Sequence, residues 1–107
     1  MEWKIVQGYD YPYMVSECGH VKKYGYYLKQ LVRHGHPHVQ LKRNGKLYWR
    51  RVCVLVMMSF NPQKRILGSI WHEDLDRTNN CVSNLKWVDR PTYYSLFYKL
   101  KFKKNHD

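Results

Sequence analysis

Two neighbouring segments decide the fold of this chain: Trp71–Asn80, with the sequence WHEDLDRTNN, and Ser83–Val88, with the sequence SNLKWV. Apolar residues flank a stretch of acidic residues, threonine and asparagine, whose short polar side chains bond to nearby backbone groups and so favour turns. The pattern predicts two strands, at Ile66–Trp71 and Asn84–Val88, joined by an acidic loop. This loop brings together a histidine, carboxylates and an asparagine pair.

One apolar segment lies on each side of this loop. Upstream, Val52–Phe60 is almost entirely apolar and ends at Asn61-Pro62, which stops a helix or a strand, and periodicity alone leaves both open. Downstream, apolar side chains recur at the i, i+3, i+4 and i+7 positions of an amphipathic helix that follows Pro91. These side chains are Tyr93, Leu96, Phe97 and Leu100.

The first half of the chain reads as short strands. Trp3–Gly19 consists of brief apolar pieces broken by glycine and proline, which indicates strands joined by turns. Val39–Arg50 alternates around Asn44-Gly45, the pair that best fits a tight hairpin turn because both residues tolerate positive φ. The alternation places Val39 and Leu41 on one face of this hairpin.

Composition favours a nucleic-acid partner. The 107 residues amount to one domain or two dependent lobes, and 19 Lys and Arg against 8 Asp and Glu give a net charge of +11. Such a surface attracts phosphate, although basic residues can also serve only to keep a small domain soluble. Aromatic residues interleaved with the charge, such as Tyr48 and Trp49, can pack on sugars or bases and favour nucleic acid.

The cysteines and the apolar runs indicate the compartment. Three cysteines without a C-x-x-C pair suggest neither a disulfide framework nor a zinc knuckle. No apolar run is long enough to span a membrane, and the N-terminus lacks the apolar stretch of a secretory signal. We therefore expect a cytoplasmic protein with no membrane partner, in the host cytoplasm if a phage encodes it.

An ordered set of short motifs runs along the chain: Gly8-Tyr9, Tyr13-x-Val15-Ser16, Gly19-x-Val21, Gly35-x-x-x-Val39-x-Leu41, Asn44-Gly45-Lys46, Leu55-Val56, Ser59-Phe60, His72-x-Asp74, Asn79-Asn80 and Asn84-Leu85-x-Trp87-Val88. In this order they resemble the small phage-type HNH homing endonucleases over roughly residues 3–88. The resemblance implies an α+β fold in which short N-terminal β-hairpins precede an HNH-like ββα core with a C-terminal amphipathic helix. It divides the chain into a β-rich DNA-binding-type module, 1–50, and a core with a basic C-terminal helix, 51–107, and it makes Val52–Phe60 a helix.

The resemblance also assigns roles in catalysis. It makes His72 the general base that activates water for attack on a phosphodiester, and it makes Asn84 the residue that orients this histidine and its loop. The family holds one magnesium-class ion with an Asp or Asn just before the histidine and an Asn or His on the final helix. This chain has Trp71 and Tyr93 at those two positions. We therefore expect no bound metal and a loss of cleavage, with magnesium or manganese needed only if the nuclease is active.

The acidic loop offers another route to a metal. Glu73, Asp74 or Asp76 could reach an ion if the register shifted. The alternative is that these carboxylates, together with Asn79 and Asn80, accept backbone N–H bonds and shape the turn. We favour the turn role for both sets.

Three further groups of residues carry predictions. Basic residues of the hairpin are expected to contact phosphates and two polar residues to contact base edges: Lys42, Arg43, Lys46, Arg50 and Arg51 for phosphates, Gln40 and Asn44 for bases. Met57 and Met58 would form an exposed apolar patch for a protein contact, unless the helix is covered on both sides. His34, His36 and His38 alternate as metal ligands can, but Pro37 interrupts them and a basic loop that touches phosphate is favoured.

The sequence leaves three functions open. The favoured hypothesis is an HNH-endonuclease-like protein that binds DNA through its basic surface without metal-dependent cleavage. The second is an active HNH DNA nickase or homing endonuclease. The third is a phage inhibitor that uses the same fold to bind a host nucleoprotein or defence complex.

Overall fold

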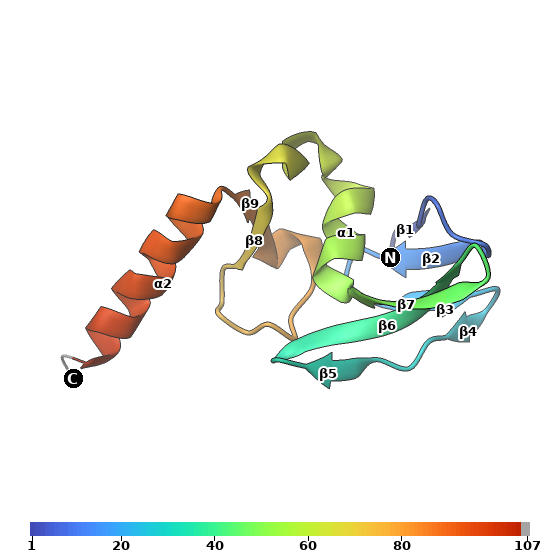
Figure 1. Ribbon diagram of the computed structural model, residues 1–107, viewed down its shortest axis with the longest axis horizontal. Helices are drawn as coiled ribbons and strands as arrows, with labels where there is room; N and C mark the ends of the chain where they lie inside the picture. Colours follow the sequence, from blue (N-terminus) through green and yellow to red (C-terminus); the bar gives the residue numbers. More distant parts are fainter. Residues whose placement is uncertain (106–107) are drawn as a thin grey trace.

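The computed structural model describes the backbone of residues 1–105 and the side chains of residues 1–100. In chain order the elements are β1 (Trp3–Ile5), β2 (Tyr13–Ser16), β3 (Val21–Lys23), β4 (Tyr26–Tyr27), β5 (Leu31–Arg33), β6 (His36–Arg43), β7 (Lys46–Arg51), α1 (Val52–Phe60), η1 (Pro62–Leu67), β8 (Ser69–His72), η2 (Val82–Asn84), β9 (Leu85–Val88) and α2 (Arg90–Asn105). The predicted α+β class, with β-hairpins first and a helix last, is confirmed (Figure 1).

The strands form three antiparallel sheets. The first has the order β1-β2-β3-β4, the second the order β5-β6-β7, and β8 pairs with β9 alone. The helix α1 lies between the β-rich part and the β8–β9 hairpin, and α2 projects away from the rest of the fold (Figure 1). Because every strand neighbour in the first two sheets is also its neighbour in sequence, the chain can build the β-rich part from successive hairpins.

The predicted Asn44-Gly45 turn is confirmed and is held from outside the hairpin. Asn44 and Gly45 have φ of 52° and 79°, as a type I′ turn requires. The two carboxylate oxygens of Asp10 accept the backbone N–H groups of Asn44 at 2.8 Å and of Gly45 at 2.9 Å. The loop between β1 and β2 thus fixes the tip of the β6–β7 hairpin.

The apolar segment 52–60 forms the predicted helix α1, which is covered on several sides. It packs against β1, β2, β6, β7, η1 and η2, and a fully apolar helix is stable only where neighbours cover most of its circumference. Its covered side chains belong to one continuous core cluster that includes both Val15 in β2 and Trp87 in β9. One core therefore joins the predicted segments 1–50 and 51–107, and residues 106 and 107 of the second segment lie outside the described residues.

The prediction of a strand from Ile66 was wrong by three residues. Pro62 opens the 3-10 helix η1, Gly68 ends it in the left-handed region with φ of 91°, and β8 begins only at Ser69. Ile66, which suggested a strand, is 91% exposed. The predicted C-terminal helix is confirmed and begins where the side chain of Asp89 accepts the backbone N–H of Thr92 at 2.9 Å, which caps the first turn.

No helix among the described residues is both long and apolar enough to cross a membrane. The three cysteines, Cys18, Cys53 and Cys81, are all free thiols.

Candidate functional site: a histidine held by an asparagine loop

His72 is the last residue of β8 and pairs with Leu85 of β9. Its side chain is only 5% exposed, and its Nε2 lies 2.8 Å from Oδ1 of Asn80. Because an amide oxygen accepts hydrogen bonds, Nε2 carries the proton and Nδ1 keeps the lone pair. The hairpin strand and the asparagine together fix both the position and the tautomer of this imidazole.

Asn84 organises the loop and does not bond the histidine itself. Its Oδ1 accepts the backbone N–H of Asp74 at 3.0 Å, and its Nδ2 donates to the Asp74 carboxylate and to the backbone carbonyl of Asn79, both at 2.9 Å. The prediction that Asn84 orients the loop agrees with these bonds. The hydrogen bond to His72, which the resemblance gave to Asn84, is made by Asn80, so the turn role expected of Asn80 needs this correction.

The turn that contains Gly19 packs closely against Asn80. Gly19, in the turn between β2 and β3, has φ of +84°, and a Cβ at this position would lie 2.9 Å from Cβ of Asn80 and 3.3 Å from a methyl group of Val52. Only glycine allows the turn to come this near without moving the asparagine. The N-terminal sheet therefore helps to position the residue that holds His72.

Two carboxylates of the loop, those of Asp74 and Asp76, act in the turn, as favoured from the sequence, whereas the turn role of Glu73 stays a prediction. The pKa of Asp74 is lowered chiefly by the amide of Asn79, which donates at 2.7 Å, and then by the backbone N–H of Asp76. The pKa of Asp76 is lowered chiefly by the hydroxyl of Thr78, which donates at 2.6 Å, and by the backbone N–H of the same residue. Their acceptor capacity is thus used within the loop.

The two positions where the resemblance implies metal ligands hold aromatic rings in contact. The rings of Trp71 and Tyr93 meet edge to face, with centroids 5.5 Å apart. Beside His72 they line a cavity of about 90 Å³ whose other walls include Leu75, Phe97 and Leu100. An indole offers no lone pair and a neutral phenol is a poor ligand for a hard cation, so these residues do not fit a magnesium-class ion.

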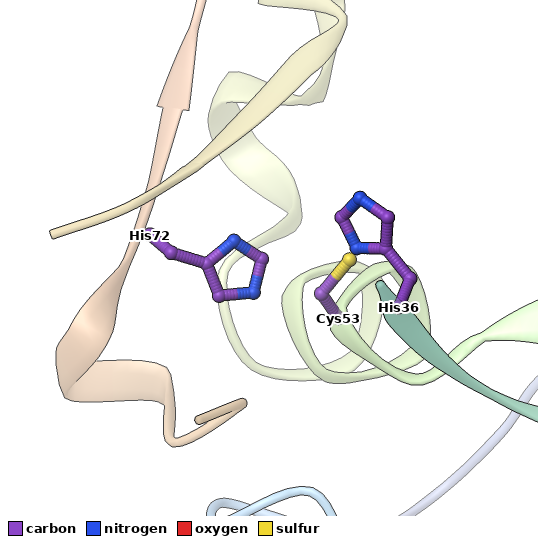
Figure 2. A group of neighbouring side chains, drawn as sticks. All are labelled: His36, Cys53 and His72. Carbon is purple, nitrogen blue, oxygen red and sulfur yellow. The ribbon is translucent and has the colours of Figure 1, made fainter. Parts of the chain in front are cut away.

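A second group near His72 was missed from the sequence. His36, at the start of β6, and Cys53, in the first turn of α1, are both buried, and each has a potential ligand atom within 4.8 Å of one on His72 (Figure 2). Burial, followed by the charge of Arg51, lowers the pKa of His36 to about 4, and burial raises the pKa of the Cys53 thiol. The signal was available in the register of the Asn-Gly hairpin. His38 pairs with Arg51, so His36 comes opposite Cys53 two residues further on.

The structure divides the predicted DNA-contacting residues between two faces of the β6–β7 hairpin. Cross-strand partners share a face, and the pairs Gln40 with Trp49, Lys42 with Leu47 and His38 with Arg51 lie opposite the buried Val39 and Leu41. Arg33 of β5, which was not among the residues predicted for the hairpin, joins this outer face because its guanidinium lies 5.7 Å from the centre of the Trp49 ring. We call Arg33, Gln40, Lys42, Trp49 and Arg51 the outer face.

The other predicted residues lie elsewhere on the hairpin. Arg43 and Lys46 pair with each other beside the turn that contains Asn44, and all three are exposed. Arg50 is already engaged: its Nε donates to the hydroxyl of Tyr9 at 2.9 Å, and its guanidinium stacks 4.8 Å from the centre of the Tyr48 ring. Arg50 is therefore partly a structural residue.

The two methionines proposed for a protein contact behave differently. Met57 is fully buried at 0% exposure, because its turn of α1 faces the core, so it cannot belong to a surface patch. Met58 is 44% exposed. The burial of Met57 agrees with the alternative in which neighbouring elements cover α1. Only Met58 remains as a candidate for a protein contact.

A histidine at the end of one strand of a β-hairpin, fixed by an asparagine-rich loop and followed by a helix, forms an HNH-like ββα core. No family model matches the chain. The chain is 35% identical over 91 residues to DNA endonuclease I-HmuI of Bacillus phage SP01, an alignment that covers 82% of this chain and 52% of that protein.

A solved structure agrees with the sequence match. The structure described as "DNA binding and cleavage by the HNH homing endonuclease I-HmuI" matches with a TM-score of 0.83 and 29% identity, over 94% of this chain and 60% of that chain. By sequence and by fold the chain is thus similar to a phage HNH homing endonuclease. It spans about half the length of the curated relative.

Proposed function

We propose that this protein binds double-stranded DNA through its outer face and does not cleave it by the magnesium-dependent HNH reaction. The observation that carries the proposal is the contact between Trp71 and Tyr93 at the two metal-ligand positions of an otherwise ordered HNH-like core. The similarity to a DNA endonuclease supports DNA as the partner.

The outer face has the chemistry that a duplex requires. Lys42 and Arg51 supply positive charge, Gln40 supplies both a donor and an acceptor, and the half-exposed Trp49 offers a flat apolar surface beside them. A two-stranded antiparallel ribbon fits the width of the major groove. In a chain of net charge +11, such contacts release counterions, so the affinity must fall as salt rises.

The surroundings of His72 support the absence of magnesium-dependent cleavage. A general base must reach the water that it activates, and this imidazole is 5% exposed with Nε2 bound to Asn80. Without a cation, nothing neutralises the charge that develops on the phosphoryl and leaving-group oxygens. Those terms supply much of the rate in metal-dependent phosphodiester hydrolysis.

Retention of the ordered histidine favours an active DNA nickase as the second candidate. The hydrogen bond from His72 to Asn80 preserves a base-like imidazole in a rigid loop. In this reading an ion would have to find other ligands, and two of the three loop carboxylates, those of Asp74 and Asp76, are engaged in the turn. We therefore place this candidate below the DNA-binding one.

Two measurements test the proposal. Purified protein is incubated with supercoiled plasmid and magnesium or manganese, beside a His72→Ala variant, and binding to a labelled duplex is measured at several salt concentrations. We expect a duplex shift that weakens steeply with salt and no nicking by either protein. Nicking by the wild-type protein that His72→Ala abolishes would establish the nickase, whereas no shift at micromolar protein would refute DNA binding and favour a protein partner.

A further inference from the structure

We propose that His36, Cys53 and His72 form a site for a divalent transition-metal ion, for which Zn²⁺ has the best-matched chemistry. One ligand atom from each residue lies within 4.8 Å of the other two, and all three residues are buried. They come from β6, α1 and β8, which are distant in sequence (Figure 2). The proposal concerns a different set of residues from the magnesium-class site and does not depend on DNA binding.

The spacing suits a tetrahedral ion. Zn²⁺ binds sulfur at about 2.3 Å and imidazole nitrogen at about 2.0–2.1 Å, so two donors at adjacent corners lie roughly 3.5 Å apart. The present separations, up to 4.8 Å, require only small side-chain rotations to close around an ion.

An unsatisfied nitrogen points into this cluster. The Nδ1 of His36 is buried and has no hydrogen-bond partner, and it is the one such side-chain atom among the described residues. The His36 side chain is 91% buried, since its exposed fraction is 9%. In Figure 2 a ring nitrogen of His36 faces the sulfur of Cys53. A buried polar atom without a partner costs free energy, which a metal bond would offset.

His72 makes the kind of second hydrogen bond that metal-bound histidines usually make. Such a histidine almost always donates its second ring N–H to an oxygen, which fixes the ring and makes the first nitrogen more basic. Here Nε2 of His72 lies 2.8 Å from Oδ1 of Asn80, so Nδ1 is the nitrogen available to an ion. Asn80 would then act as a positioning residue for the metal site.

The ligand set selects the class of ion. One thiolate with two imidazoles suits zinc, cobalt or copper, and it does not suit magnesium or calcium, which prefer oxygen. Binding displaces the thiol proton of Cys53, and the thiolate offsets part of the charge beside Arg51 and Arg77. The fourth position would be filled by water or an anion from the cavity of about 1030 Å³ that His36 and Cys53 help to line.

An ion in this position would join the start of β6, the start of α1 and the end of β8. These elements surround the junction between the N-terminal sheets and the β8–β9 hairpin (Figure 1). The lone pair of His72 would be used in the metal bond, so the imidazole could not also accept a proton from water. The site would therefore replace the role as base with a role in stability.

Metal-stripped protein is tested with two probes. Zn²⁺ is measured by elemental analysis after gel filtration, and Co²⁺ is followed by its visible absorption and its thiolate-to-cobalt charge-transfer band. We expect one zinc ion per chain, a charge-transfer band with cobalt, and neither stoichiometric binding nor stabilisation with magnesium. Cys53→Ser should lose the band, and Asn80→Ala should weaken zinc binding by roughly 10- to 100-fold.

Control variants outside the three-residue cluster test whether metal binding is specific to it. Cys18→Ser and His34→Ala change a thiol and an exposed imidazole outside the cluster, and both should bind cobalt as the wild type does. If Cys53→Ser does not fold, alkylation of the wild-type protein is compared with and without zinc: zinc should slow the alkylation of the buried Cys53 and leave that of Cys18 unchanged. Sub-stoichiometric zinc, or a charge-transfer band that survives Cys53→Ser, or alkylation of Cys53 that zinc does not slow, would overturn the proposal.

Discussion

The indole of Trp71 and the phenol of Tyr93 meet edge to face, with ring planes at 83° and centroids 5.5 Å apart. Trp71 comes from β8 and Tyr93 from the first turns of α2, so the contact attaches the last helix to the hairpin that carries His72. The pair thus has a packing role at the two positions where the family resemblance implies metal ligands. An aromatic pair of this geometry contributes about 0.5–1.5 kcal/mol beyond its buried area.

Restoring oxygen ligands at these two positions should restore a hard-metal site. The double variant Trp71→Asp with Tyr93→Asn places a carboxylate and an amide oxygen beside His72, and we expect it to bind Mn²⁺, measured by the loss of the free-ion EPR signal. It should also unfold more easily, by roughly 2–4 kcal/mol, because two rings are lost. Wild-type protein serves as the control, and a folded double variant that leaves the free Mn²⁺ signal unchanged would contradict this prediction.

Charge removal on the outer face should lower the salt dependence of DNA binding. Lys42→Ala and Arg51→Ala should each reduce the slope of log K against log salt by about 0.9, the value for one phosphate contact. Trp49→Ala should weaken binding without changing the slope, because it removes packing and no charge. Lys64→Ala, in η1 on the other side of α1, is the matched control, and an equal change of slope in this variant would show that the outer face has no special role.

Local patterns in the sequence predicted most of the fold. The Asn44-Gly45 turn predicted a hairpin where the structure has one, because this turn is governed by short-range backbone preferences. The apolar run 52–60 predicted an element with the right bounds, and the family resemblance decided that this element is a helix. The strand expected from Ile66 was wrong, because a short apolar pair after Pro62 cannot by itself distinguish a strand from an exposed 3-10 turn.

The candidate site was only partly predictable. His72 was found through its local motif, whereas the group formed with His36 and Cys53 depends on three elements that meet only in the folded chain. Asn80 and Asn84 carry the same functional group four residues apart, and only the loop geometry decides which of them bonds the imidazole. Composition predicted the positive charge, and strand alternation separated Gln40 and Lys42 from Val39 and Leu41, but their cross-strand partners Trp49 and Leu47 required the register.

The loop beside His72 should be sensitive to the chemistry of one amide. Asn84 accepts one hydrogen bond and donates two, so Asn84→Ala should lower the free energy of unfolding by about 1–3 kcal/mol, measured in urea. Asn84→Asp should be at least as harmful, because a second carboxylate oxygen would face Asp74 and the carbonyl of Asn79. Ser83→Ala, at the exposed neighbouring residue, is the control, and an Asn84→Asp variant as stable as the wild type would refute this account of the loop.

The carboxylate of Asp10 should make the β6–β7 hairpin sensitive to acid. The backbone N–H groups of Gly45 and then Asn44 hold the pKa of Asp10 below its ordinary value of 3.8, so the ionised form stabilises the fold. A depressed pKa means that this contribution is fully present above about pH 3.8 and is lost as the pH falls through the lower folded value.

Asp10→Asn keeps the side-chain shape but loses one acceptor oxygen and the charge. We expect this variant to unfold at a lower urea concentration than the wild type at pH 7. Its free energy of unfolding should also change less between pH 5 and pH 2, because the variant lacks one carboxyl group whose pKa differs between the folded and unfolded states. Glu73→Gln, at an exposed carboxyl outside the hairpin, is the matched control, and urea curves for Asp10→Asn that fall with acid as steeply as those of the wild type would show that Asp10 does not hold the turn.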